Sequence, residues 1–201
     1  MELRYKDIIL RDFKESDIDS MIRWNTGHHP WMEWDAPWEN VEEPAFDVEK
    51  YRKASLDYIA AEKSTPRWSL QLEVEGVHIG YVGSYRIGED YGDVSDEEAQ
   101  TKTWHRAVGL DILDDAYWDR GFGTMALEGW LRYLLENGIE EIYLQTWSGN
   151  GRMIHVAEKL GFLECNRRVG IREWMGKRYD ALTFRLDIGR FLLKQNSEEP
   201  I

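Results

Sequence analysis

The sequence predicts a single-domain α+β protein whose mixed, mostly antiparallel sheet is flanked by helices. A chain of 201 residues has the length of one domain, and its 42% of hydrophobic residues suffices for a core. Strand-like alternation dominates the first part of the chain, whereas helical spacing alternates with strands after Leu113. We expect one domain over residues 1–201, with a core over about 8–187 and a C-terminal helix end and polar tail over 188–201.

The first half of the chain contains a strand, two helices and a β-hairpin. Ser16 and Asp17 offer an N-cap directly before the helical spacing that starts at Ile18. Gly76 separates two alternating runs and therefore predicts the turn of a hairpin. The strand is expected over 8–11, the helices over 18–24 and 48–61, and the hairpin strands over 68–75 and 77–85.

The second half alternates strands with helices and ends in another hairpin. Asn137 and Gly138 are typical of a helix C-terminus, and Gly161 closes the next helix in the same way. A turn is expected at Met175-Gly176-Lys177. The strands are expected over 104–113, 142–147, 162–173 and 178–186, and the helices over 122–134 and 152–160.

Charge and cysteine content restrict the partners and the compartment. The 38 acidic residues outnumber the 25 basic ones, and the net charge of -13 disfavours nucleic acid but attracts a cation. The single cysteine, Cys165, cannot form an internal disulfide, and this fits a reducing cytoplasm. The start of the chain is charged where a signal peptide would be apolar, and no apolar run is long enough for a membrane span. We therefore expect neither export nor membrane insertion. His28 and His29 lack metal-ligand spacing, so we expect no metal.

An anion site is predicted where the strand over 104–113 leads into the helix that follows it. Arg120, Gly121, Gly123 and Thr124 would bring a guanidinium and free amides to the positive end of that helix. The alternative is a tight turn without a ligand. A Walker A loop is excluded because Thr124 is not preceded by lysine.

A dinucleotide-binding fingerprint also matches this loop. It would use Gly121, Gly123 and Ala126, with Glu140 and Glu141 near the position of a ribose-binding acid. The preceding antiparallel hairpin and the location past mid-chain fit this alternative poorly.

The run Asp119-Arg120-Gly121-Phe122-Gly123-Thr124 resembles the acetyl-coenzyme A pyrophosphate loop of the GNAT N-acetyltransferases. Residues 150–162 are similar to the second helix motif of that family. Residues 9–17, the Tyr117-Trp118 pair and residues 176–182 are similar to the branch with the RimJ, RimL and spermidine acetyltransferases. The resemblance covers about residues 8–186 and implies a GNAT-like sheet with a splayed central strand pair.

The resemblance also implies a set of cofactor-binding residues. The backbone of Asp111, Ile112 and Leu113 would bind the pantetheine arm of acetyl-coenzyme A. The amides of the loop would hold the pyrophosphate, with Asn150 and Met153 close to the cofactor. A plain helix N-cap is the alternative for Asn150, and both roles can hold together.

The family's catalytic side chains are missing from their usual positions. Ala157 stands where many members have a tyrosine acid, and Ala107 and Gln145 stand where members carry a glutamate base. His105 could relay a proton, although a structural histidine is the alternative. Glu33 is the other catalytic candidate.

The Trp-rich segment is the expected wall of the acceptor site. Glu33 and Asp35 could bind an ammonium, with Trp31 and Trp34 available for cation–π contacts, and Glu173 is a further candidate. A packed loop with outward acids is the alternative.

We expect an acetyl-coenzyme A-dependent N-acetyltransferase acting by direct attack in a ternary complex. The acceptor is a primary amine, such as a protein N-terminus, a polyamine or a small amine, and its identity stays open. Two alternatives are a catalytically inactive GNAT-like module that binds acyl-coenzyme A and a Rossmann-type nucleotide-binding oxidoreductase. A homodimer also stays open.

Overall fold

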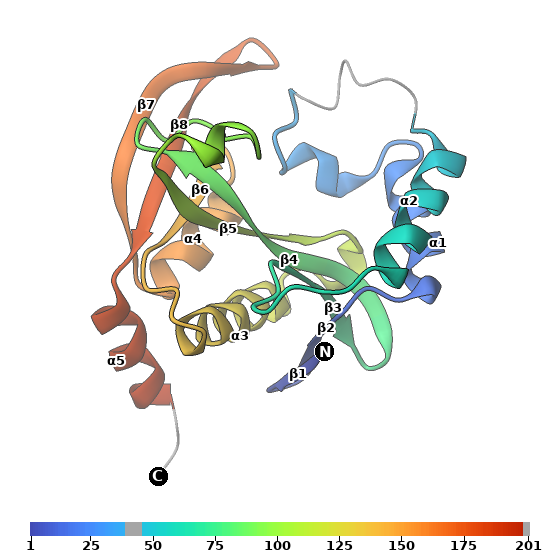
Figure 1. The fold of residues 1–201 in the computed structure, drawn as a ribbon. Helices are drawn as coiled ribbons and strands as arrows, with labels where there is room; N and C mark the ends of the chain where they lie inside the picture. Colours follow the sequence, from blue (N-terminus) through green and yellow to red (C-terminus); the bar gives the residue numbers. More distant parts are fainter. Residues whose placement is uncertain (39–45, 199–201) are drawn as a thin grey trace. The chain divides into compact units, whose positions relative to one another are not determined.

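The computed structural model of the chain describes residues 1–38 and 46–198 (Figure 1). Within these residues the chain forms an eight-stranded sheet in the order β1-β2-β3-β4-β5-β6-β8-β7 and five α-helices. The strands are β1 (Glu2–Tyr5), β2 (Ile8–Arg11), β3 (Ser69–Val74), β4 (Val77–Gly88), β5 (Trp104–Ile112), β6 (Ile142–Trp147), β7 (Phe162–Trp174) and β8 (Lys177–Leu186). The helices are α1 (Ile18–Asn25), α2 (Val48–Ala60), α3 (Phe122–Glu136), α4 (Gly151–Lys159) and α5 (Ile188–Glu198).

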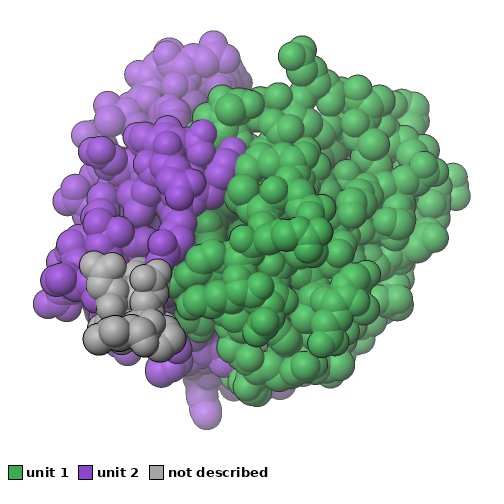
Figure 2. All heavy atoms as spheres, turned by 90° about the horizontal axis from the view of Figure 1, so that it is seen from below, with its two compact units in different colours: residues 1–82, 110–130 green, residues 83–109, 131–201 purple. Residues whose placement is uncertain are grey.

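The sheet is mixed and mostly antiparallel, which confirms the predicted α+β class. It is not the parallel sheet that the oxidoreductase alternative requires. The chain divides into two compact units, coloured separately in Figure 2, and each is described by itself. Unit 1 comprises residues 1–82 and 110–130, and unit 2 comprises residues 83–109 and 131–201. No helix among the described residues is long and apolar enough to cross a membrane.

Unit 1 is built on the antiparallel strands β1, β2 and β3. Leu10 faces Leu3 on one side and Leu72 on the other. Leu10 and Leu72 are completely buried, as are Leu127 and Trp130 of α3. The sequence did not predict β1, because its residues alternate only between exposed and half-buried positions and carry little apolar signal.

The start of α1 differs from its prediction. Asp17 stands at the N-cap position, but its side chain makes no capping hydrogen bond to α1. Its carboxylate is buried and accepts hydrogen bonds from Arg11 at 2.6 and 2.8 Å. A charged side chain that must be buried is stabilised better by a guanidinium than by one backbone amide, so the expected cap gives way to an ion pair.

Unit 2 is built around β6, which pairs with one parallel strand, β5, and one antiparallel strand, β8. Its parallel pairing with β5 runs from Arg106↔Ile142 to Val108↔Leu144. Its antiparallel pairing with β8 continues to the end of the strand at Trp147↔Ala181.

The strands β7 and β8 form the predicted C-terminal hairpin (Figure 1). Met175 and Gly176 make its turn with positive φ angles of 50° and 72°. β7 stands at the end of the strand order, and its register shifts between Glu164 and Asn166 and again between Arg168 and Arg172. Both shifts are β-bulges or local irregularities of the edge strand.

Candidate active site

The predicted anion loop lies at the N-terminus of α3, in unit 1. Asp119 and Gly121 have positive φ angles of 57° and 83°, which turn the chain into the helix. The first ladder bond runs from the Met125 amide to the Gly121 carbonyl at 3.1 Å. Because the amides before Met125 belong to the first turn, the helix itself offers them no acceptor. They can bind an anion at the positive end of the helix dipole.

Arg120 adds a full positive charge to this loop. Its exposed guanidinium lies over the rings of Tyr117 and Phe122, at 5.3 and 5.0 Å from their centroids. The two rings restrict the directions that the guanidinium can take. The loop thus combines amides, a helix dipole and a held cation.

Gly123 lies on the side of the loop that faces β5. A Cβ on Gly123 would lie 3.6 Å from the Ile112 Cδ1 atom and 3.7 Å from the Leu110 Cδ1 atom. Gly123 therefore faces β5, and a Cβ there would make only ordinary contacts with that strand. Gly121 is the residue whose backbone angle itself favours glycine.

The end of β5 leads directly into this loop, and some of its backbone already has partners. The Leu113 amide donates to the Ile79 carbonyl at 2.9 Å, and the Trp118 indole donates to the Ile112 carbonyl at 2.7 Å. These bonds fix the strand end and the loop to each other. A pantetheine arm would have to use other groups of this segment or replace the indole.

The side chain of Asp111 meets two groups from distant parts of unit 1. Tyr81 on β4 donates its hydroxyl to the Asp111 carboxylate, and the charge of Asp35 acts on both residues. Burial, the charge of Asp35 and the opposing hydrogen bond from Tyr81 together raise the pKa of Asp111 to about 7. Burial and the neighbouring carboxylate of Asp111 likewise raise the pKa of Tyr81 far above its ordinary value.

The Trp-rich segment brings only part of the expected acceptor wall to Asp111. Glu33 is exposed and lies 3.5 Å from His28. The Trp31 indole donates to the Trp24 carbonyl at 3.1 Å, which holds the segment against α1. Asp35 is the expected acceptor residue whose charge reaches Asp111.

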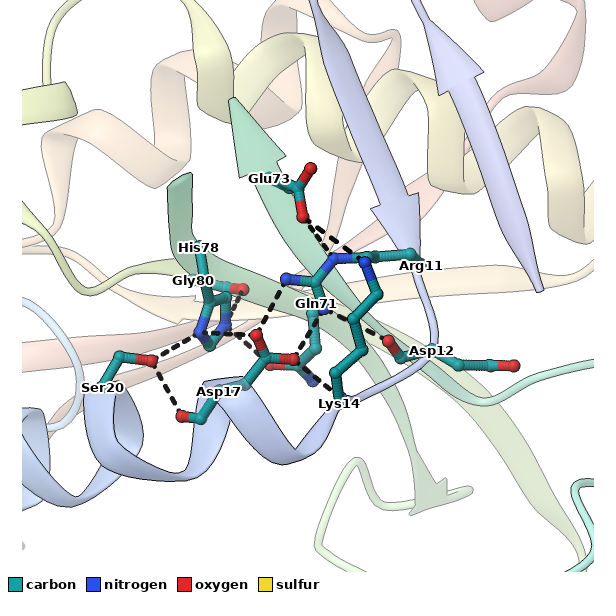
Figure 3. Close-up of polar contacts among 9 residues, drawn as sticks. All are labelled: Arg11, Asp12, Lys14, Asp17, Ser20, Gln71, Glu73, His78 and Gly80. Atoms are coloured by element: carbon teal, nitrogen blue, oxygen red, sulfur yellow. Dashed lines mark hydrogen bonds and ion pairs between the residues drawn. The ribbon is translucent and has the colours of Figure 1, made fainter. Parts of the chain in front are cut away.

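A buried polar network anchors the strand that carries Tyr81 (Figure 3). Arg11 binds Asp17 and also donates to Glu73 at 2.5 Å. The Nδ1 atom of His78 lies 2.7 Å from the Ser20 hydroxyl. Its Nε2 atom lies 2.9 Å from the Gln71 side-chain oxygen and 3.1 Å from the Gly80 carbonyl oxygen. The network therefore joins β2, α1 and β3 to the residue directly before Tyr81.

His105 belongs to a separate polar group in unit 2. Its Nδ1 lies 3.3 Å from Glu141, and its ring packs against Tyr143 with centroids 5.0 Å apart. The Tyr143 hydroxyl donates to Glu141 at 2.9 Å, and Arg185 lies 3.3 Å from the same carboxylate. The hydrogen bond from Tyr143, assisted by His105 and Arg185 and opposed by burial, lowers the pKa of Glu141.

Most of the other predicted site residues in unit 2 make contacts that support the fold. The Asn150 side chain accepts the Met153 amide at 3.0 Å, which confirms the predicted N-cap of α4. Ala157 is completely buried. The Gln145 amide donates to the Tyr91 carbonyl at 2.8 Å. Glu173 is exposed on β7, opposite Arg178 of β8.

The sequence of residues 7–163 matches the family model described as the acetyltransferase (GNAT) domain. The chain belongs to the GNAT acetyltransferase family. As a GNAT acetyltransferase it uses acetyl-coenzyme A as its acetyl donor. No curated protein matches the sequence.

Solved structures of GNAT acetyltransferases share the fold at low sequence identity. A GNAT-family acetyltransferase from Bacillus anthracis is 13% identical, with a TM-score of 0.64 over 92% of this chain and 98% of that one. RimL, a ribosomal L7/L12 alpha-N-protein acetyltransferase in complex with coenzyme A, is 12% identical, with a TM-score of 0.65 over 92% and 97%. A spermidine N-acetyltransferase chimera of SpeG from Vibrio cholerae and hSSAT is 16% identical, with a TM-score of 0.63 over 92% and 98%.

For this GNAT acetyltransferase, sequence reasoning missed the side-chain partners of Asp111. The resemblance drew attention only to the backbone of Asp111. No local pattern joins residues 35, 81 and 111, so the signal appears only when the fold brings them together.

Proposed function

We propose that the chain transfers an acetyl group from acetyl-coenzyme A to a primary amine that arrives as a cation. The family match over residues 7–163 supports the acetyl transfer. The charge of Asp35, which acts on Asp111 of the strand that enters the anion loop, supports a cationic acceptor. Neighbouring carboxylates create a negative potential that attracts an ammonium. The net charge of -13 supports approach of such an acceptor over a longer range.

The loop residues 119–124 fit the diphosphate of the donor. They supply first-turn amides of α3 and the ring-flanked guanidinium of Arg120, which together suit an anion. In this proposal Asp35 binds the acceptor. Direct attack of the amine on the thioester needs no covalent acyl-enzyme, and burial raises the pKa of the Cys165 thiol, which disfavours it as a nucleophile.

The relatives named by their activity act on amines of different size. RimL acts on a protein N-terminus, and the SpeG chimera is a spermidine N-acetyltransferase. The acidic environment of Asp111 supports a cationic amine, a class that includes both.

An amine panel tests the proposal directly. Purified protein is incubated with acetyl-coenzyme A and polyamines, aminoglycosides, small amines or short peptides, and thiol release and product mass are followed. Amine-dependent thiol release with an acetylated product is the expected result. Coenzyme A binding without any acetylated amine would instead identify an inactive binding module.

A further inference from the structure

We propose that the Asp111 carboxylate removes the proton from the acceptor ammonium, and that Tyr81 is the residue that positions this carboxylate. The inference rests on the proposed function and assigns the proton transfer that this function requires. The usual base positions of the family hold Ala107 and Gln145, neither of which can accept a proton at neutral pH.

Asp111 stands at the right place along the chain. It is the penultimate residue of β5, which ends at Ile112, and the chain continues through Leu113 toward the anion loop. The Leu113 amide donates to the Ile79 carbonyl at 2.9 Å, which joins this end of the strand to β4. Tyr81 lies two residues after Ile79 on β4, and its hydroxyl donates to the Asp111 carboxylate.

The Asp111 side chain is held rather than free to rotate. The Tyr81 hydroxyl donates to the carboxylate. The backbone of Asp111 is held separately, because Gly80 of β4 lies directly against its carbonyl. Gly80 in turn is tied to the buried network through His78. A carboxylate fixed in this way keeps its orientation when an acceptor binds.

Charged and titratable groups from three elements control this carboxylate. Asp35 approaches from the Trp-rich segment, Tyr81 from β4, and Tyr51 of α2 acts on Tyr81. Burial and Asp35 favour the protonated carboxyl, whereas the Tyr81 hydroxyl favours the carboxylate. The balance puts the pKa of Asp111 near neutral pH, where a general base is most effective.

The proton balance is complete without a further reagent. The Asp111 carboxylate takes one proton from the ammonium, and the freed lone pair forms the N–C bond to the thioester carbonyl carbon. The C–S bond then breaks, a second nitrogen proton goes to the leaving sulfur, and the third remains on the amide. Asp111 returns its proton to water, and the products are the acetamide and the coenzyme A thiol.

The pH profile of kcat/KM distinguishes this role from a structural one. In the wild type we expect activity to fall below about pH 7, as Asp111 becomes protonated. Asp111→Asn should lower kcat by about 10²- to 10⁴-fold. It should also remove the fall in activity at low pH, which is the acidic limb of the profile. Asp111→Glu, which keeps a carboxylate, should recover part of the activity.

Two further variants should move the limb in opposite directions. Tyr81→Phe removes a hydrogen bond that favours the carboxylate, so the limb shifts to higher pH. Asp35→Asn removes a neighbouring charge that disfavours the carboxylate, so the limb shifts to lower pH. His105→Gln tests the competing proton acceptor and should leave the limb in place.

A titration in the absence of turnover gives a second readout. Carbon-13 NMR of aspartate-labelled protein follows the Asp111 carboxyl, identified by the signal that Asp111→Asn loses. The expected midpoint is near neutral, and it should move upward in Tyr81→Phe and downward in Asp35→Asn. An ordinary aspartate midpoint would overturn the proposal. If Asp111→Asn does not fold, Asp111→Glu, which lacks the same aspartate signal, identifies it.

The outcomes separate this inference from the proposed function. An active wild type whose profile is unchanged in Asp111→Asn, or lost in His105→Gln, overturns the role of Asp111 alone. A wild type that binds coenzyme A but acetylates no amine overturns the proposed function, and the proton-transfer role with it.

Discussion

Gly80 and Asp111 approach so closely that a Cβ on Gly80 would overlap the Asp111 carbonyl oxygen, well inside van der Waals contact distance. The obstructing atoms belong to the backbone and cannot rotate away. A side chain at this position would therefore push β4 from β5 just where Tyr81 reaches Asp111.

We expect Gly80→Ala to destabilise the protein by about 1–3 kcal/mol, the usual cost of overpacking. Urea unfolding at neutral pH measures this change. Gly151→Ala is a matched control, because a Cβ there would have no atom within 4 Å and the φ angle of Gly151 is not in the left-handed region. Equal stability of the two variants would contradict the close approach.

The two loop glycines should respond differently to substitution. Gly121→Val introduces a branched side chain at a φ of +83°, so the loop must change its backbone and the melting-temperature shift caused by coenzyme A should shrink. Gly123→Ala adds only ordinary contacts with β5, so that variant should keep most of the shift.

Gly138→Val separates loop damage from general strain. Gly138 also has a left-handed φ, of +78°, but lies at the end of α3 with no atom within 4 Å of an added Cβ. Its variant should lose stability and still respond fully to coenzyme A. A full response of Gly121→Val as well would remove the loop from the donor site.

The buried pair of Arg11 and Asp17 should dominate the acid sensitivity of unit 1. Removing one partner leaves the other charge buried, so Arg11→Met should cost about 3–5 kcal/mol of unfolding free energy. The double variant Arg11→Met/Asp17→Leu should recover part of that loss. Urea unfolding of both variants beside the wild type provides the comparison.

The pH dependence of this pair has a defined sign. Burial opposes ionisation of Asp17, but hydrogen bonds from Arg11 and the Lys14 amide outweigh it, so the pKa of Asp17 lies below its ordinary value. A carboxyl whose pKa is lower when folded stabilises the protein above its unfolded pKa, and this contribution disappears as pH falls through the folded pKa. The wild type should therefore lose more stability on acidification than the double variant does. Parallel acid titrations would contradict this assignment.

Acceptor binding should depend on salt if the acceptor is a cation. Raising the ionic strength screens exposed charges over about 8 Å at physiological salt, so the KM for the amine should increase. Asp35→Asn should raise that KM while leaving coenzyme A affinity unchanged. Asp57→Asn on α2 changes the net charge equally but removes an exposed acid paired with Lys53, and it should have little effect. A salt-independent KM with wild-type values in Asp35→Asn would argue against a cationic acceptor at this position.

Local sequence signals predicted those parts of the fold that depend on local physics. Hydrophobic periodicity located α2, α3 and both hairpins, and turn chemistry located Gly76 and the Met175-Gly176 turn. The anion loop was also local, because its glycines, its arginine and the helix start follow one another along the chain.

Local sequence signals could not predict which side chains pair with one another. Asp17 looked like a helix cap until the fold placed Arg11 beside it, and Asp111 looked like a backbone contributor until Tyr81 and Asp35 approached it. These interactions join residues far apart in sequence, so periodicity can indicate a face but cannot name its partners.

The irregular register of β7 affects how copies of the protein interact at high concentration. A long, flat edge strand is a template for pairing with other chains and for fibril growth. The two register shifts interrupt the regular ladder of β7. Copies of the chain that meet at this edge would not find an unbroken row of matching hydrogen bonds, so the strand should resist aggregation although Val169 and Ile171 are exposed.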